Sequence, residues 1–468
     1  MVFIFALPTW AQDSSSQSGS QSGPAAQPVP PVPAQNSGKP AGNSDANPVP
    51  AVVTPSAENV SLSGAQSPSL EPGSRRSFLF PQIEIYSQVD SNAANTAGSG
   101  GNNITSITSI LGGLTLQKLS PHSQFNLNYL GGRSFSNAGD QFSSTTHTFG
   151  AAERWLRARW SGVFTDQLSY MSESLLGGAN SPDLGGSAAI TNLSPTFLGG
   201  QSLFTSRGPR LLNTSVVEVD YQSSPRSSYT LVGSYDFLHF FGPGLVDSGT
   251  TQAQVGYNYA LSHRDTISVL YRFGAIRFQG SSQSIHDHTA QLAYGHRIAQ
   301  RLALRLAGGP EATLTQSPTL GSTTYVSWSV DSSLQYQLAR TSLELSYDHG
   351  VTAGSGLFLG STTDQVSAVA SRQLSRMWSV SFEGGYARNR NNLTSSLTAP
   401  ANATVDSVFG SVQLIRAIGR NANFFVNYWP RYQTSNTAVC PGTSCGTSLV
   451  GHQVAVGFEW HPNPISLE

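Results

Sequence analysis

The feature that most constrains the fold of this chain is a series of short turns at a nearly constant spacing. Each turn is rich in Ser, Pro, Ala or Gly and ends in Arg or His, as in residues 119–122, 223–226 and 298–301. Successive turns lie 36 to 44 residues apart, except for one interval of 67 residues. Such a repeat has to be recognised first, because the repeated unit determines the architecture.

Between the turns, apolar and polar residues alternate. In residues 230–237, Leu231, Tyr235 and Phe237 fall on one side and Asp236 falls on the other. A period of two predicts β-strands with one apolar and one polar face. Each repeat is then a strand, a longer loop rich in Gly, Ser and Asn, and a returning strand. Extended from Pro81 to Trp460, the series gives nine hairpins, or about eighteen antiparallel strands with both ends on the same side.

The low charge of the chain decides which face points outward. Charged residues are 11% of the sequence, less than half of the roughly 25% usual in soluble domains. A soluble sheet protein would have too little charge to cover so many strands. If the apolar faces meet lipid and the polar faces line an interior, the low charge is explained. No run approaches the roughly 18 apolar residues of a membrane-spanning helix, and a net charge of −1 gives no reason to bind nucleic acid.

Backbone groups in hydrocarbon must all be paired, so a sheet there has to close on itself. The predicted fold class is therefore all-β, a transmembrane antiparallel up-and-down β-barrel of about 18 strands with short turns on one side and long loops on the other. A soluble propeller or solenoid is the alternative reading of the same pattern.

The terminal alternating segment 454–460, with aliphatic residues leading to Phe458 and Trp460, resembles the last strand of bacterial outer-membrane β-barrel proteins, and the whole barrel resembles the porin-like members of that class. Residues 461–468 depart from the usual ending. The resemblance implies an outer-membrane location, contact with lipid and lipopolysaccharide, the barrel-assembly machinery as a partner during biogenesis, small polar solutes as cargo, and no cofactor. It also makes a homo-oligomer possible.

The N-terminal part has a different composition. Residues 1–11 end in an apolar run and a small-residue site typical of a signal peptide remnant. Residues 12–75 are rich in Pro, Ser and Gln, which predicts a disordered periplasmic linker. Residues 76–468 are the predicted barrel. Cys440 and Cys445 lie in one loop, where a disulfide suits an oxidising compartment, although two free thiols remain possible.

Alternation also predicts the lining of the pore. Nine acidic residues and five arginines fall on the polar face, which favours cations mildly; salt bridges that fill a closed barrel are the other reading. The predicted pore-lining residues are Glu84, Arg154, Glu218, Asp220, Asp236, Arg272, Arg297, Arg305, Asp331, Glu344, Asp348, Glu383, Arg431 and Glu459. Glu153 and Asp166 fall on the apolar face, so we expect bulges or interfacial positions there.

The apolar face has its own predicted set, with aromatic residues near the strand ends where interfacial girdles belong. Its members are Leu114, Leu116, Phe125, Leu127, Tyr129, Leu231, Tyr235, Phe237, Val255, Tyr257, Val269, Tyr271, Leu304, Trp328, Val330, Leu345, Tyr347, Val380, Phe382, Tyr386, Val426 and Tyr428.

The longest connection in the barrel is the insertion of residues 174–212. Loops of this length are usually functional or disordered. In porin-like proteins a long outer loop often folds into the lumen as a constriction, and the resemblance implies the same here. Its apolar residues, among them Leu203 and Phe204, favour packing; an exposed cap and a disordered loop are the alternatives.

Catalytic patterns are scarce. His286 and His288 would share a face and could act as a metal ligand or base, but a solvated loop mouth is the simpler reading, and no third residue orients them. Asp348 and His349 face opposite ways. The glycine-rich segment 354–360 joins two strands without a following helix, so it lacks a phosphate site and is interpreted as a flexible outer loop.

These observations predict a non-enzymatic outer-membrane channel that passes small polar solutes by passive diffusion, with a mild preference for cations, and contains no metal. The alternatives are a barrel for export or secretion of a polymer, which would be closed on its own, and a barrel hydrolase that depends on His288.

Overall fold

The computed structural model describes residues 77–94, 104–138, 143–172, 202–299, 301–317, 321–391, 402–439 and 446–467. The predicted signal peptide remnant, the predicted linker and both cysteines lie outside the described residues, as do residues 174–201 of the insertion. In the described part of the chain, no helix has the length and hydropathy of a transmembrane helix.

The described residues form one antiparallel sheet in which each strand pairs with its neighbours in the sequence. β1 also pairs with β18, for example Ile85 with Phe458, so the sheet closes into an 18-stranded barrel. The predicted fold class is confirmed. The barrel strands are β1 Ser77–Asp90, β2 Thr105–Leu119, β3 Ser123–Ser136, β4 Ser144–Arg157, β5 Trp160–Met171, β6 Arg210–Ser224, β7 Ser227–Phe240, β8 Ser248–Ala260, β9 Asp265–Phe278, β10 Ser284–Ala299, β11 Leu302–Ser317, β12 Gly321–Gln337, β13 Thr341–Thr352, β14 Ser361–Gln373, β15 Trp378–Asn391, β16 Thr404–Ala417, β17 Ala422–Val439 and β18 Gly446–Trp460.

The two ends of the barrel differ in the length of their connections. Every turn of the predicted series lies at one end, where β2 passes to β3 and β10 passes to β11 within a few residues. The other end, called here the long-loop end, carries the insertion between β5 and β6. β1 starts and β18 finishes at the tight-turn end, which confirms that both barrel termini lie on the same side.

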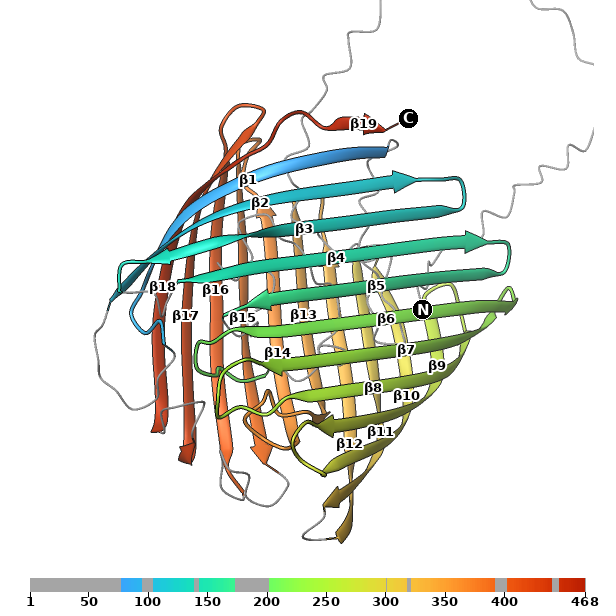
Figure 1. Cartoon of the computed structure of the whole chain (residues 1–468). Helices are drawn as coiled ribbons and strands as arrows, with labels where there is room; N and C mark the ends of the chain where they lie inside the picture. The colour runs from blue at the N-terminus through green and yellow to red at the C-terminus, as the bar shows by residue number, and fades with distance from the viewer. Residues whose placement is uncertain are drawn as a thin grey trace, which may run out of the picture.

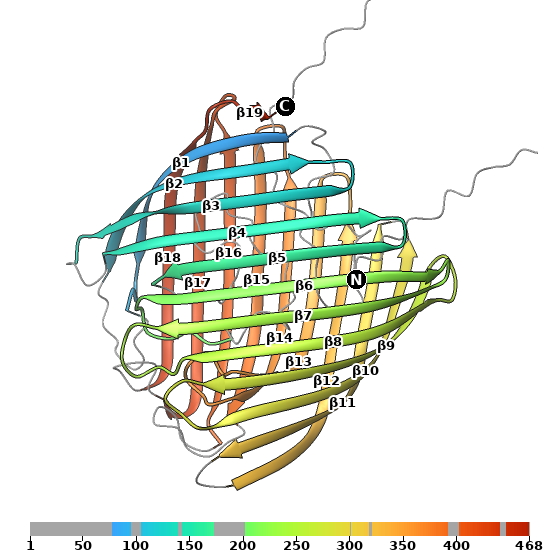
Figure 2. The ribbon, with the colours of Figure 1, turned by 45° about the vertical axis from the view of Figure 1, so that its right-hand side comes forward.

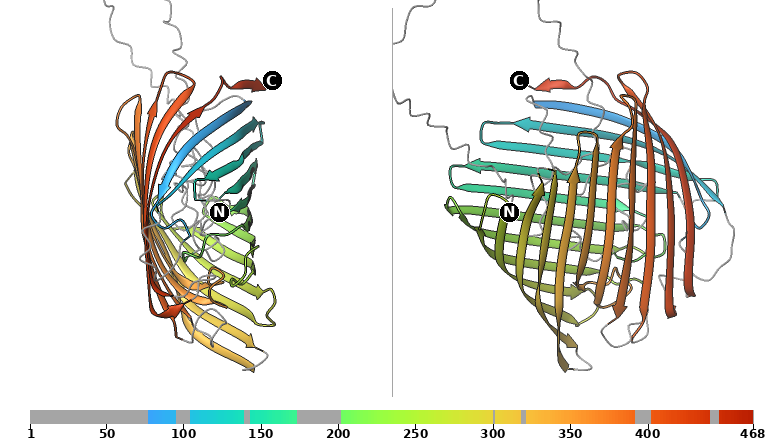
Figure 3. Two further views of the ribbon diagram at one scale, coloured as in Figure 1. Left: turned by 60° about the vertical axis from the view of Figure 1, so that its left-hand side comes forward. Right: turned by 180° about the vertical axis from the view of Figure 1, so that it is seen from behind.

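The strands are strongly tilted. In Figures 1 and 2 the strands of the front wall, β1 to β8, cross those of the rear wall, β13 to β18, at a steep angle. The same two walls are seen from the side and from behind in Figure 3. Closure of a sheet requires such tilt, typically about 35–45° from the barrel axis, so opposite walls of one barrel cross each other.

Burial separates the two faces of the wall as alternation predicts. Large apolar side chains are exposed on the outer face, including Leu231 at 59%, Val269 at 62% and Trp328 at 68%. All members of the predicted apolar set lie on this face. The polar residues between them are buried on the inward face. The usual arrangement of a soluble protein, with an apolar interior and a polar exterior, is therefore inverted.

The residues after the last barrel strand also have a place in the fold. Ile465–Leu467 form the short strand β19, which pairs with residues 77–79 of β1. The rings of Phe80 and His461 lie 4.6 Å apart at the same seam. The C-terminal extension therefore covers the part of the β1 edge that β18 does not reach.

The bulges that were one alternative for Glu153 and Asp166 are absent, so that alternative is wrong, whereas interfacial positions stay a prediction. Both residues sit in regularly paired segments of β4 and β5, and both point outward. Asp166 accepts hydrogen bonds from Ser215 Oγ at 2.5 Å and Asn213 Nδ2 at 3.1 Å, both on the neighbouring strand β6. Cross-strand hydrogen bonds, and not a bulge, accommodate this carboxylate on the outer face.

Candidate functional site

The inward face of the barrel carries most of the charged side chains of the strands. Alternation places all fourteen predicted pore-lining residues on this face, opposite the exposed apolar residues. Several are almost fully buried, such as Glu84 and Arg431. This inward orientation is the geometric condition for lining a pore.

A group of charged residues on β9 to β12, called here the charged wall, consists of Arg272, Asp287, Arg305, Glu311 and Asp331. Arg272 Nη2 lies 3.8 Å from Asp287 Oδ2 and also 3.8 Å from Glu311 Oε1. Arg305 forms an ion pair with Asp331. Acidic residues outnumber arginines in this wall, and each guanidinium lies beside at least one carboxylate.

The carboxylates of the charged wall are held by further hydrogen bonds. Glu311 accepts one from Ser327 Oγ at 2.9 Å and one from the backbone N of Val351 at 3.4 Å. Asp287 accepts one from Thr289 Oγ1 at 2.9 Å. These bonds fix the positions of the two carboxylates.

Two members of the charged wall, Asp287 and Glu311, are not among the pore-lining residues predicted from the sequence. Asp287 lies between the two histidines interpreted above as a solvated loop mouth. It is two residues from Thr289 on β10, so both side chains lie on the inward face. Glu311 follows Gly308, Gly309 and Pro310, which interrupt the apolar and polar alternation of β11. In both cases, alternation continued along the whole strand predicts the inward position.

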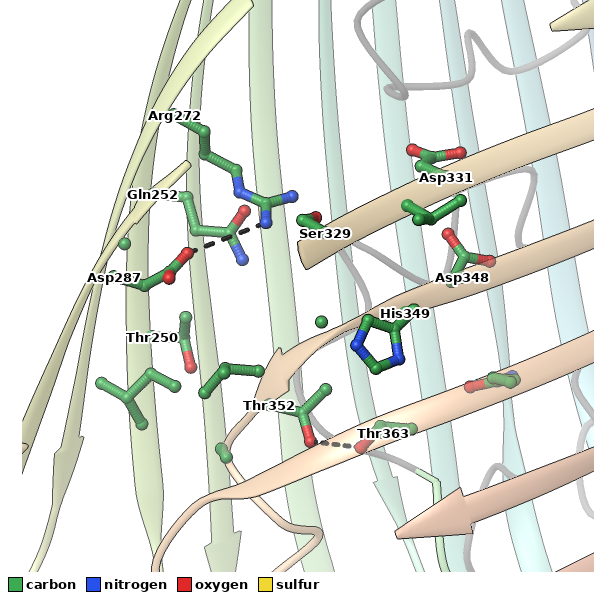
Figure 4. A pocket seen from close by; sticks show the side chains of 17 residues that line it. Thr250, Gln252, Arg272, Asp287, Ser329, Asp331, Asp348, His349, Thr352 and Thr363 are labelled. Carbon is green, nitrogen blue, oxygen red and sulfur yellow. Dashed lines mark hydrogen bonds and ion pairs between the residues drawn. The ribbon is translucent and has the colours of Figure 1, made fainter. Parts of the chain in front are cut away.

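A cavity lies beside the charged wall on the inward side. In Figure 4, Gln252, Arg272 and Asp287 come from one side, whereas Asp331 and Asp348 come from the other. Hydroxyl groups complete the lining, and Thr352 Oγ1 and Thr363 Oγ1 are joined by a hydrogen bond of 2.8 Å. The cavity therefore offers charged, amide and hydroxyl groups to a hydrated solute.

Two segments occupy the lumen near the long-loop end. The first, the inner strap, is residues 202–206, the end of the insertion before β6. The second, the inner turn, is residues 353–360 between β13 and β14. Ser355 Oγ accepts a hydrogen bond from the backbone N of Ser202 at 2.7 Å, so the two segments are joined directly.

The inner strap is fixed to the opposite wall by side-chain amides. Asn389 on β15 accepts a hydrogen bond from Ser202 Oγ at 2.6 Å and donates one to the Ser202 carbonyl at 3.1 Å. Gln433 on β17 accepts from the Phe204 backbone N at 2.8 Å and donates to the Phe204 carbonyl at 3.1 Å. Because β15 and β17 lie about half the circumference away from β6, the inner strap crosses the lumen.

Apolar contacts support these hydrogen bonds. Leu203 is fully buried against Leu357 and Phe358 of the inner turn, and against Val405 and Val439 of the barrel wall. Phe204 is equally buried in a second cluster, where its ring lies 6.1 Å from the ring of Trp429. The expectation that Leu203 and Phe204 pack is confirmed. The described end of the insertion therefore packs inside the barrel.

The inner turn continues the crossing toward β7 and β9. Its Gly356 carbonyl accepts a hydrogen bond from Val246 N at 2.9 Å, and its Leu359 carbonyl accepts one from Gln283 Nε2 at 3.0 Å. Arg210, whose guanidinium lies 5.2 Å from the Phe240 ring, donates a hydrogen bond to Thr205 Oγ1 at 2.8 Å. Strap and turn together form a continuous bridge inside the long-loop end.

The interpretation of residues 354–360 as a flexible outer loop is wrong. Leu357 and Phe358 have no exposed surface, and the segment lies inside the barrel. Gly354, Ser355 and Gly356 have φ values of 81°, 54° and 79°, and a left-handed path of this kind favours glycine. The glycines serve a tight buried turn, which burial of the two apolar side chains stabilises.

Neither candidate pair that contains histidine places both of its side chains in the lumen. His286 and His288 share a face as predicted, but it is the outer face, where the His288 Nδ1 lies 2.8 Å from the Tyr271 hydroxyl. Asp287 points the opposite way, into the lumen. Asp348 and His349 also face opposite ways, and His349 pairs with Asp364 at 2.6 Å. Among the described residues, no group of three or more His, Cys, Asp or Glu is placed to hold a metal.

Comparison with known proteins finds no matching family model and no matching curated protein. Solved structures with a similar barrel include OccK2 (OpdF) of Pseudomonas aeruginosa, with 8% identity, coverage of 82% of this chain and 98% of that chain, and a TM-score of 0.43. OccK3 (OpdO) of the same organism has 10% identity, coverage of 82% and 96%, and a TM-score of 0.42. The FrpB iron transporter of Neisseria meningitidis has 7% identity, coverage of 83% and 82%, and a TM-score of 0.39. At these identities and TM-scores, the likeness is limited to the fold.

Proposed function

We propose that this chain is an outer-membrane channel through which small polar solutes diffuse passively. The observation that carries the proposal is the inverted polarity of the closed wall. Apolar side chains such as Leu231 and Val269 cover the outside, while charged and amide side chains fill the inward face. Such a wall suits lipid on one side and water on the other, and diffusion through it requires neither a cofactor nor a chemical step.

The mechanism is sieving by size and charge. The inner strap and the inner turn narrow the long-loop end, so a solute passes beside them and along the charged wall. The fourteen predicted pore-lining residues include nine carboxylates and five arginines, and Asp90, Asp287 and Glu311 add inward carboxylates. Charge of one sign in a pore sets its ion preference, so the channel prefers cations mildly.

The remaining parts of the chain fit this location. The outer leaflet lies at the long-loop end, because barrels of this kind have short periplasmic turns and long outer loops. Residues 1–11 then belong to a signal peptide and residues 12–75 to a periplasmic linker. Cys440 and Cys445, between β17 and β18, form a disulfide in the oxidising exterior. Lipid and lipopolysaccharide surround the barrel, the assembly machinery inserts it, and copies of the chain associate into a homo-oligomer.

Planar-bilayer recording of the purified full chain tests this function. We expect steady ohmic current and, in a salt gradient, a reversal potential of the sign that denotes cation preference. Changing Asp287→Asn and Glu311→Gln together should shift that potential toward anions, because two inward carboxylates are neutralised while the side-chain size is kept. The matched change Glu153→Gln, on the outer face, should leave the potential unaltered.

A barrel that remains closed under all voltages, with normal folding, would contradict a diffusion channel and favour an exporter. Cleavage of lipid or peptide that disappears in His288→Ala would instead support a hydrolase. A reversal potential that is identical in the double variant and the native chain would remove the charged wall from the solute path.

A further inference from the structure

Three tight turns, which join β12 to β13, β14 to β15 and β16 to β17, are neighbours because their strands are consecutive in the sheet. These strands belong to the wall that faces the viewer in the right-hand view of Figure 3. Residues 338–343, 365–382 and 407–424, which form the turns and the strand ends beside them, contain five arginines and no Asp, Glu or Lys. Four of these arginines, all exposed, are called here the basic patch: Arg340, Arg372, Arg376 and Arg416.

The acidic side chains that follow on the same strands point away from the basic patch. Glu344 on β13 and Glu383 on β15 lie on the inward face. Arg372 and Arg416 lie on the outward face of β14 and β16. The sheet itself therefore separates these carboxylates from the arginines of the outer surface.

The opposite end of the same strands is arranged differently. On β15, Arg388 lies 3.7 Å from Asp406 of β16. Arg390 of β15 lies 3.5 Å from Asp364 of β14. Arginines at the long-loop end are thus matched by carboxylates on neighbouring strands, whereas the segments of the basic patch supply arginines alone. This difference indicates that the basic patch suits an anion from outside the chain.

The backbone of the basic patch is fixed without any ligand. The Arg340 carbonyl accepts a hydrogen bond from Gln373 N at 2.9 Å, and the Met377 carbonyl accepts one from Ala417 N at 2.8 Å, so each turn is joined to the next strand. The guanidinium carbon of Arg416 lies 5.3 Å from the ring centre of Trp378, its cross-strand partner on β15. Little order therefore has to be gained when an anion binds.

The turns also carry exposed apolar side chains. Leu374 and Met377 in the β14–β15 turn are 52% and 48% exposed, and Ile418 in the β16–β17 turn is 48% exposed. On the strands beside them, Leu343 and Phe382 continue the apolar outer face. The apolar surface thus reaches the turns themselves. At a membrane surface, such side chains enter the acyl region while the arginines keep their guanidinium groups among the lipid head groups.

We propose that the basic patch binds the phosphate groups of anionic phospholipids in the leaflet at the tight-turn end. The planar guanidinium groups pair with phosphate oxygens, and the acyl chains lie along the apolar face beside Leu343 and Phe382. A free phosphate ion would use only the first of these contacts, whereas a phospholipid uses both. The proposal rests on the proposed membrane location of the barrel.

Lipid retention by the purified full chain in detergent, measured by native mass spectrometry, tests the proposal. Phosphatidylglycerol is the probe, and phosphatidylcholine with the same acyl chains is the control lipid. We expect the folded chain to retain phosphatidylglycerol in preference. Changing Arg372→Gln and Arg416→Gln together should weaken that retention about tenfold or more, because basic residues beside anionic lipid are lost. The matched pair Arg388→Gln and Arg390→Gln should leave retention unchanged.

A second variant keeps all the arginines. Thr341 is the cross-strand partner of Arg372 on the outer face, so Thr341→Asp places a carboxylate beside this guanidinium and should also weaken retention. Thr341→Asn, which has a similar size and no charge, should retain phosphatidylglycerol like the native chain. Changing Arg372→Lys and Arg416→Lys together keeps the charge and should preserve most of the retention.

The outcomes separate the site, its ligand and the channel. Equal retention in the native chain, the double Gln variant and Thr341→Asp would overturn the site. Displacement of phosphatidylglycerol by inorganic phosphate at the same concentration would overturn the lipid as its ligand. Conductance in bilayers is measured separately. Loss of lipid retention with current intact therefore leaves the channel standing, and a closed barrel that still retains the lipid leaves the basic patch standing.

Discussion

Two parts of the inward face, both toward the long-loop end, have opposite chemistry. On β9 to β12 the wall is charged, and Arg272 lies within ion-pair distance of both Asp287 and Glu311. On β16 and β17 the inward face carries a patch of buried apolar side chains, Val405, Phe409 and Trp429. The difference follows from what covers each part, because the inner strap lies on the apolar part and the cavity adjoins the charged part.

The comparison shows that inward residues of a barrel are not polar by position alone. An inward side chain next to water must be polar, whereas one beneath an inserted segment gains stability from apolar contact, at about 25 cal/mol for each Å² buried. The apolar patch on β16 and β17 is therefore the docking surface of the inner strap. Removing the strap from it should be the strongest way to test the contrast.

Releasing the inner strap is the largest of the expected effects. Changing Leu203→Asp and Phe204→Asp together would bury two carboxylates in apolar clusters, at a cost of several kcal/mol. The strap should leave its patch while the barrel, held by its own strand pairing, stays folded. Single-channel conductance and the size of excluded polyethylene glycol should both rise, whereas the same change at exposed Leu261 should have no effect.

An unchanged conductance in this double variant would mean that the strap does not narrow the path. Retained folding can be checked by the heat-dependent shift in gel mobility that closed barrels give in detergent.

The next largest effect concerns the place where the barrel closes, at strands β17, β18 and β1 beside the apolar patch. Arg431 and Asp90 form an ion pair of 2.7 Å with no exposed side-chain surface, and it ties β17 to β1 across β18. Arg431→Gln leaves Asp90 buried without a charged partner, which should lower the free energy of unfolding by about 3–5 kcal/mol. Urea unfolding of the barrel in detergent measures the change.

An exposed pair provides the control for this prediction. The Arg390 and Asp364 side chains are 49% and 26% exposed, and pairs of this kind contribute about 0–1 kcal/mol. Arg390→Gln should therefore shift the unfolding midpoint little. Equal shifts for the two variants would show that burial does not separate the two ion pairs.

Much of this architecture could be predicted from the sequence. Alternation with a period of two determines the orientation of every side chain in a strand once the orientation of one side chain is known. The strand count, the position of the termini, the inward orientation of residues such as Glu84 and Arg431, and the outward orientation of residues such as Trp328 all follow from it. The inner turn and the docking patch could not be predicted. Leu357, Phe358 and Trp429 are apolar on the inside because another segment covers them, and alternation along one strand carries no information about that segment.

The smallest expected effect tests how strap and turn are joined. Ser355→Ala removes the hydroxyl oxygen that accepts the hydrogen bond from Ser202 N at 2.7 Å. The buried N–H group of Ser202 then loses this acceptor. We expect a loss of about 1–3 kcal/mol in the local stability of the strap, with the barrel intact.

Because Asn389 and Gln433 still hold the strap, its mean position should stay and its openings should become more frequent. Single-channel recording should therefore show brief steps to a higher conductance over the native baseline, and Ser375→Ala, in an exposed tight turn, should show none. A current trace without added steps would mean that the wall amides alone hold the bridge closed.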